Sequence, residues 1–282
     1  MEATKAEPAE RRPVGTTHSE AEINASKFYH LLKSYNNFDQ MEVLPLLQTT
    51  LDLKPEEQCF IGIYYRARSN VETILEITHA KHFQAAAMLA RSIFELAVDV
   101  KMLHIVPNGW LKVMIFNDVE RLRCARKVVA FKSKHPDTQV DVSTFDEFIN
   151  SNAARVDALA KSTWASPTDR QHWSGMRIGE RVALLGSSMH KIYEVDYPRL
   201  SWYAHSGLTG VLNLPSETFV HLCANSFWLA SECYLELLNS IIRRFDLEKA
   251  ITNLDAKLLA ARALPFNDDP ETEEWLLRSI QN

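Results

Sequence analysis

The sequence predicts an all-α protein, a helical bundle followed by additional C-terminal helices. Only 8 of its 282 residues are glycine; this is about 3%, where proteins average ~7%, and β folds rich in tight turns use more. No stretch of convincing length alternates apolar and polar residues as a half-buried strand does. Apolar residues make up 46% of the chain, which is enough to fill the core of a large domain.

The N-terminal part divides into a tail and two helices. Residues 1–22 are rich in Ala, Glu, Thr, Pro and Arg and almost lack large apolar side chains, so we expect a disordered tail there. Residues 23–35 predict a short helix. Pro55 suits the first turn of a helix over 55–78, because proline loses no needed hydrogen bond at that position.

The next helix is the most apolar one. Residues 81–105 include FQAAAMLARSIFELAVDVKML, which is apolar around most of its circumference, so this helix is expected to be central and buried. Pro107 ends it, and another long helix is predicted over 109–132. Residues 133–142 read as a loop.

The second half of the chain continues with shorter helices. Ser143 followed by Asp146 resembles a capping signal for a helix over 143–161, and residues 163–175 read as a loop. The remaining predicted helices span residues 178–192, 197–206, 216–245, 247–263 and 271–281. The expected organisation is therefore a tail over 1–22, a helical bundle domain over 23–245 and a C-terminal helical extension over 246–282.

Charge and cysteine content restrict the classes of function. The net charge of −5 supplies no global positive field for nucleic acid, so no DNA signal is present and RNA binding would need a local patch. Four cysteines without a CxxC pair favour a reducing, cytoplasmic compartment. We find neither a signal-peptide apolar region nor a stretch long enough to span a membrane, so no membrane association is expected.

A polar stripe lies in YEVDYPRLSWYAHSG, residues 193–207. Tyr197, Ser201 and His205 recur at every fourth residue, so they share one face of a helix that starts near Asp196. Two interpretations remain open. The stripe is either a buried seam whose polar groups satisfy one another, or one half of an active site.

A second stripe crosses the apolar helix. Arg91, Glu95 and Asp99 are four residues apart, and Arg91 can pair with Glu95. Buried charges are costly unless paired. These groups either form an internal ion pair that fixes helix register, or face the stripe of Ser201 and His205 and tune its histidine.

Other candidate sites are a basic run and a histidine pair. The RNA-binding candidates in ERLRCARKVVAFKSKH are Arg121, Arg123, Arg126 and Lys127. A solvated helix face explains the same run. His79 and His82 lack acidic or cysteine partners at a metal-site spacing, and no GxSxG, Walker A or GxGxxG motif occurs. The sequence thus predicts no metal and no cofactor.

Three segments in order carry a family resemblance: LARSIFELAVDV (89–100), HWSGMRIGE (172–180) and the 193–207 segment. Together they resemble a family of bacterial and phage-associated helical proteins of unknown function, over roughly residues 60–240. The family pattern is an Arg-x-x-x-Glu helix, a Trp element and a Tyr-x-x-Leu-Ser-x-x-x-His segment. In this chain it falls on Arg91, Glu95, Trp173, Tyr197, Leu200, Ser201 and His205.

The arrangement is also similar to the HEPN superfamily of helical toxins, abortive-infection proteins and RNases, which carry Arg-x4–6-His. Arg199 and His205 have that spacing, although Leu200 stands where many of these nucleases have a polar residue. The resemblance implies an RNA-cleaving or toxin-type phage-defence protein. It would be a metal-independent endoribonuclease in which Arg199 and His205 act on the phosphodiester at a homodimer interface. The alternative is a non-catalytic helical module that binds a protein partner or small ligand in the polar seam.

Overall fold

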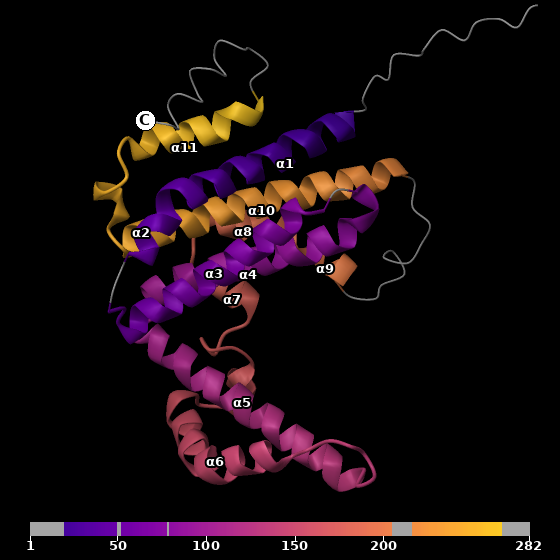
Figure 1. The fold of residues 1–282 in the computed structure, drawn as a ribbon, viewed down its shortest axis with the longest axis vertical. Helices are drawn as coiled ribbons and strands as arrows, with labels where there is room; N and C mark the ends of the chain where they lie inside the picture. Colours follow the sequence, from indigo (N-terminus) through magenta and orange to yellow (C-terminus); the bar gives the residue numbers. More distant parts are fainter. Residues whose placement is uncertain (1–19, 50–51, 78, 205–215, 267–282) are drawn as a thin grey trace, which may run out of the picture.

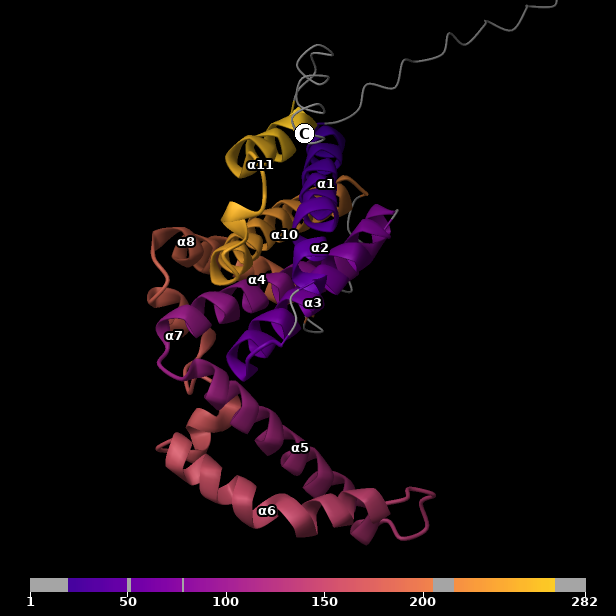
Figure 2. The same cartoon turned by 60° about the vertical axis from the view of Figure 1, so that its left-hand side comes forward.

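The computed structural model describes residues 20–49, 52–77, 79–204 and 216–266. Within these ranges the chain forms helices and no strand, which confirms the all-α class. Four long helices make the bundle: α1 (Glu20–Phe38), α3 (Pro55–Leu75), α4 (Phe83–Ile105) and α10 (Ser216–Arg244). A pair of helices projects from one end of it (Figures 1 and 2).

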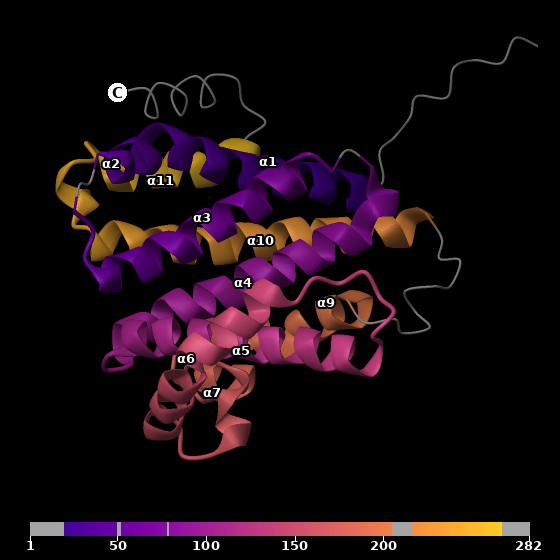
Figure 3. The same ribbon diagram turned by 60° about the horizontal axis from the view of Figure 1, so that its bottom comes forward.

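Helix α4 occupies the centre of the bundle, as its apolar circumference predicts. It packs against α10, α3 and α9 (Tyr197–Ala204), and Figure 3 shows it between α10 and the projecting helices. Ile93, Phe94 and Met102 are completely buried. A short 3-10 turn, Ala80–His82, precedes it, and Pro55 opens α3 as expected.

The N-terminal helix is longer than predicted. Helix α1 begins at Glu20, inside the expected tail, and continues through a π-helical turn, Asp39–Val43, into α2 (Leu44–Gln48). It packs along α10, and Leu31, Leu32 and Tyr35 are buried there. This tertiary burial extends the helix beyond the segment that its own pattern marked. Residues 1–19 of the predicted tail lie outside the described residues.

Helices α5 (Gly109–Lys134) and α6 (Ser143–Thr163) form an antiparallel hairpin, called the arm below (Figures 1 and 2). The arm has its own small buried cluster of Ile115, Ala160 and Trp164. The predicted cap at Ser143 is wrong. Ser143 is the first helical residue, and its N–H donates to the carboxylate of Asp141 at 2.9 Å.

The segment after the arm is more broken than predicted. Residues 163–175 contain a 3-10 turn, Pro167–Gln171. The single helix predicted over 178–192 is two, α7 (Ile178–Ala183) and α8 (Ser187–Val195). Gly186 separates them with a φ of +91°, a conformation that side-chain-bearing residues rarely adopt.

The C-terminal part packs onto the bundle. After a 3-10 turn, Leu247–Lys249, helix α11 (Leu254–Ala263) lies beside α1 (Figures 1 and 2) and ends in a 3-10 turn, Leu264–Phe266. Leu247 and Ala261 belong to the main core. The described part of the expected extension therefore contributes to the bundle core, whereas the predicted helix over 271–281 lies outside the described residues.

The described residues were predicted to contain neither a membrane-spanning helix nor a metal site. No helix there is sufficiently long and apolar to cross a membrane. No group of three or more potential metal ligands gathers among the described side chains. His79 instead caps the turn that follows it, because its Nδ1 accepts a hydrogen bond from the Lys81 N–H at 3.1 Å.

Candidate functional site: a polar cleft beside α4

A cleft of 640 Å³ opens between α4, α7, α9 and the 3-10 turn that follows the arm. Most of its lining side chains are polar or charged. The lining residues are Arg91, Glu95, Thr168, Asp169, Gln171, His172, Gly175, Met176, Arg177, Ile178, Glu180, Arg181 and Tyr197. We refer to it as the polar cleft.

One edge of the polar cleft joins the two stripes that the sequence marked. Glu95 Oε1 accepts hydrogen bonds from Arg91 Nε at 2.9 Å and from the Tyr197 hydroxyl at 2.8 Å. The Arg91 guanidinium also lies over the Tyr197 ring, 5.0 Å from its centre. Residues 102 positions apart thus meet on one carboxylate oxygen.

This edge is only partly buried. The Arg91–Glu95 pair forms as its spacing predicts, but the two side chains are 24% and 39% exposed, so the pair lies at the cleft wall and is not fully internal. Tyr197 is buried beside them, and burial followed by the hydrogen bond and charge of Glu95 raises its pKa to about 12. The phenol therefore remains a hydrogen-bond donor at neutral pH.

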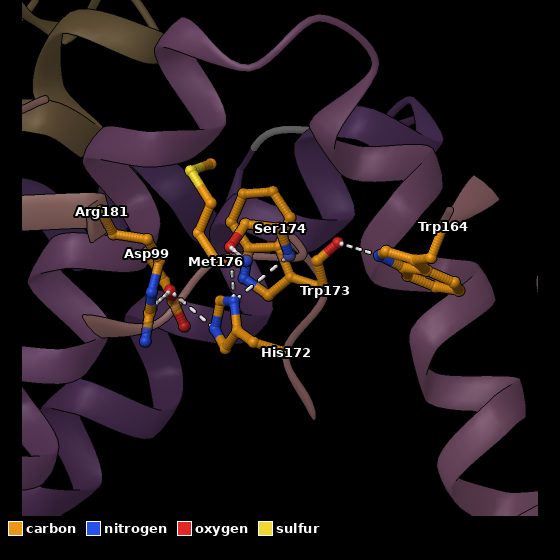
Figure 4. Close-up of polar contacts among 7 residues, drawn as sticks. All are labelled: Asp99, Trp164, His172, Trp173, Ser174, Met176 and Arg181. Carbon is orange, nitrogen blue, oxygen red and sulfur yellow. Dashed lines mark hydrogen bonds and ion pairs between the residues drawn. The ribbon is translucent and has the colours of Figure 1, made fainter. Parts of the chain in front are cut away.

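The third residue of the α4 stripe, Asp99, has a different partner set. Its carboxylate pairs with Arg181 of α7 and with His172 Nε2 at 3.2 Å. Figure 4 shows Asp99 between these two side chains. Asp99 therefore holds both α7 and the segment before it against α4.

His172 is fixed on both sides of its ring (Figure 4). Nδ1 accepts from the Ser174 N–H at 3.2 Å and lies 2.9 Å from the Ser174 hydroxyl, while Nε2 faces Asp99. Both ring nitrogens are therefore occupied by protein groups. This arrangement suits a side chain that orients the cleft wall and does not offer a nitrogen to a substrate.

Trp173 anchors the same segment. It is 4% exposed, and its carbonyl accepts a hydrogen bond from Trp164 Nε1 at 3.3 Å (Figure 4). Gly175 follows with a φ of +76°, and a Cβ there would lie 3.2 Å from the Trp164 ring. The Trp element of the family pattern thus joins the arm to the bundle and supports the polar cleft.

Neither Ser201 nor Arg199 of the predicted catalytic segment lines the polar cleft. Ser201 donates to the carbonyl of Tyr197 at 3.0 Å, so its hydroxyl is satisfied within α9. Arg199 is exposed and does not line the polar cleft, since two residues on from Tyr197 is about 200° around a helix. His205 lies outside the described residues. The described structure therefore does not bring Arg199 to the Glu95 edge.

The basic run of RNA-binding candidates lies on the arm, where two of its arginines form ion pairs with carboxylates. Arg126 makes two contacts to Asp157, at 2.6 and 3.2 Å, and Arg123 pairs with Glu120. The Arg121 guanidinium packs 4.9 Å from the centre of the Phe148 ring. Of the four candidates, Lys127 alone has neither an ion pair nor a ring contact with a described residue.

Sequence reasoning missed His172, Ser174 and Arg181. His172 and Ser174 lie in the segment HWSGMRIGE of the family pattern, and Arg181 directly follows it. This segment could therefore have indicated all three residues. The contact between Arg181 and Asp99 joins residues that lie 82 positions apart in the sequence. No local spacing rule predicts a contact over that separation.

Comparison with known proteins identifies a family. No curated protein and no solved structure matches the chain. A family model matches residues 57–217, which is more than half of the chain and includes the three segments of the family pattern as well as the polar cleft. The chain belongs to the DUF5677 family, a family of unknown function.

Proposed function

We propose that this chain is a helical ligand-binding module whose polar cleft takes a small zwitterion. The observation that supports this function is the balance of charge in the lining. Six lining residues are charged, and they divide evenly into Arg91, Arg177 and Arg181 against Glu95, Asp169 and Glu180. A ligand with one positive and one negative group matches such a surface better than a pure anion or cation.

Two groups are best placed to contact the ligand. Both protein donors to Glu95 meet on Oε1, so among the described residues Oε2 remains to accept a hydrogen bond from a ligand cation. The Arg177 side chain is exposed, lines the polar cleft and makes no ion pair with a described residue. It would bind the ligand carboxylate or phosphate.

A thermal-shift screen of amino acids, dipeptides and phosphoamines in large excess tests this function, because a ligand that binds only the folded state raises the melting temperature. We expect a zwitterion to stabilise the wild type, and Arg177→Gln and Glu95→Gln to remove that shift. Arg121→Gln on the arm is the matched control and should retain it. If no zwitterion in the screen stabilises the protein, the proposal fails.

A second candidate function is the metal-independent RNA cleavage that the HEPN resemblance implies. One observation favours it: Arg199 is exposed, as a guanidinium that contacts a phosphodiester must be. In this function Arg199 would stabilise charge on the phosphate, His205 would exchange protons with the ribose hydroxyl or the leaving oxygen, and two copies would meet at the site.

Incubation of the purified protein with labelled single-stranded RNA in the presence of a chelator tests this second function. Cleavage should persist with the chelator and disappear in Arg199→Ala and His205→Ala, with melting temperatures unchanged. Reversing the charges of Arg123, Arg126 and Lys127 should weaken RNA binding and flatten its salt dependence. A wild-type protein that leaves the RNA intact would exclude this function and leave the zwitterion proposal untouched.

A further inference from the structure

A second cavity, of 480 Å³, lies where the C-terminal ends of α4 and α10 meet the connection between α7 and α8. It shares no lining residue with the polar cleft. Its lining residues are Lys101, His104, Ile105, Leu184, Leu185, Ser240, Arg243 and Arg244. Three of them are cations and none is acidic, in contrast to the balanced polar cleft. We refer to it as the cationic pocket.

Carboxylates near the cationic pocket lie outside its lining. Lys101 pairs with Glu236 of α10, and Arg244 pairs with Glu56 of α3 at 3.2 Å. Arg243 is 77% exposed and reaches its partner in the next turn, Glu248, only at 4.0 Å. These acids pair with the cations but do not line the pocket, so every charged residue in the lining is a cation.

His104 lines the same pocket as the three cations. Burial lowers the pKa of His104, and the charges of Arg244, Lys101 and Arg243 lower it further, against a hydrogen bond to the backbone of Ser240. The helix C-termini supply partial negative charge at this end of α4 and α10.

Arg244 is held in place before any ligand arrives. Its guanidinium packs 5.2 Å from the centre of the Phe60 ring and bonds Glu56 through Nη2, while its Nε has no hydrogen-bond partner. A fixed guanidinium loses less conformational freedom on binding than a mobile side chain does. Beside it, Ile105 and Leu184 leave about half of their apolar surface exposed, at 49% and 58%.

We propose that the cationic pocket binds the phosphate group of a small organic phosphate whose apolar part lies on Ile105 and Leu184. Two guanidiniums and an ammonium around one cavity suit the several acceptor oxygens of a phosphate. The exposed apolar side chains at the rim give the organic part a surface to cover. This site is independent of the polar cleft and of either function proposed for the chain.

Calorimetric titration of the full-length protein with phenyl phosphate, inorganic phosphate, benzoate and phenol tests the proposal. Phenyl phosphate should bind, about tenfold more tightly than inorganic phosphate, and phenol should not bind. In NMR spectra, phenyl phosphate should shift the ring resonance of His104, assigned with His104→Gln. Benzoate binding as tightly as phenyl phosphate would overturn the assignment to phosphate.

Two variants locate the site. Arg244→Gln should lower the affinity for phenyl phosphate about tenfold, but it also removes the pair with Glu56. Arg243→Gln is therefore the second variant, since that exposed side chain can change without unfolding the protein, and it should lower the affinity severalfold. Arg121→Gln on the arm should change nothing. Absence of phenyl phosphate binding, or equal affinity in all variants, would overturn the proposal.

Discussion

The Tyr64 hydroxyl donates a 2.6 Å hydrogen bond to Asp39, a carboxylate that is completely buried in the π-helical turn after α1. Tyr234 of α10 donates to the other oxygen at 2.7 Å, and Arg68 Nε lies 3.4 Å from the carboxylate. Three helices are therefore joined through one carboxylate. A buried carboxylate survives only when such partners replace water.

Tyr64→Phe should destabilise the protein by about 2 kcal/mol, because it removes a hydrogen bond to a buried charged group. Chemical denaturation measures the free energy of unfolding. Tyr65→Phe is the matched control: Tyr65 is 43% exposed, so we expect its loss to cost under about 0.5 kcal/mol. Equal losses of unfolding free energy for the two substitutions would show that the buried hydrogen bond from Tyr64 to Asp39 does not stabilise the fold.

Asp39→Asn should change how stability depends on pH. Burial raises the pKa of Asp39 above its ordinary value of 3.8, and the tyrosine hydrogen bonds only partly offset this. The folded state then holds the proton more tightly than the unfolded state, so this group lowers stability as the pH rises from 3.8 through the raised pKa. The free energy of unfolding of the wild type should therefore fall relative to that of Asp39→Asn over this pH range. A difference that stays constant across pH would contradict the prediction.

Glu95→Ala should cost about 1 kcal/mol, not the 3–5 kcal/mol of an interior pair, because solvent screens the partly exposed contact with Arg91. Urea denaturation gives the difference. Glu120→Ala, which removes the exposed pair with Arg123 on the arm, should cost less than about 0.5 kcal/mol. A loss of several kcal/mol for Glu95→Ala would mean that the cleft wall is sealed from water.

Two glycine-to-alanine substitutions should change the free energy of unfolding in opposite directions. Gly175→Ala places a Cβ 3.2 Å from the Trp164 ring at a φ of +76°, so we expect a loss of about 1–2 kcal/mol. Gly62→Ala, in α3 with nothing within 4 Å of the new Cβ, should stabilise by about 0.5–1 kcal/mol through helix propensity. Melting temperatures that move in the same direction would refute the assignment for Gly175.

Thiol labelling of the native protein should modify one cysteine rapidly. Cys124 is exposed on the arm, whereas Cys59, Cys223 and Cys233 are buried. Burial raises the pKa of the Cys223 thiol to about 11 and that of Cys233 well above its ordinary value, so these thiols are both inaccessible and protonated. Cys124→Ser should abolish the fast reaction, and any fast reaction that remains would show that the bundle opens.

Much of the fold could be read from local patterns. The apolar circumference of residues 81–105 and the proline after it predict α4, which begins two residues later, and the same reasoning places α3 and α10 to within a few residues. The pairing of Arg91 with Glu95 also follows from spacing on one helix. The break between α7 and α8 was missed, because a single glycine in a short apolar segment does not by itself end a helix.

By itself, the sequence determined the helical class, the long helices α3, α4 and α10 and the i,i+4 pair on α4, since all of these depend on contacts within a turn or two of helix. Only the tertiary structure decided that Tyr197 completes the Glu95 contact, that Asp99 holds Arg181 and His172, and that Arg199 lies apart from the polar cleft. The same holds for the cationic pocket, whose residues come from α4, α10 and the connection between α7 and α8. Helical periodicity fixes which face of a helix a side chain occupies, whereas the packing of distant helices fixes what that face meets.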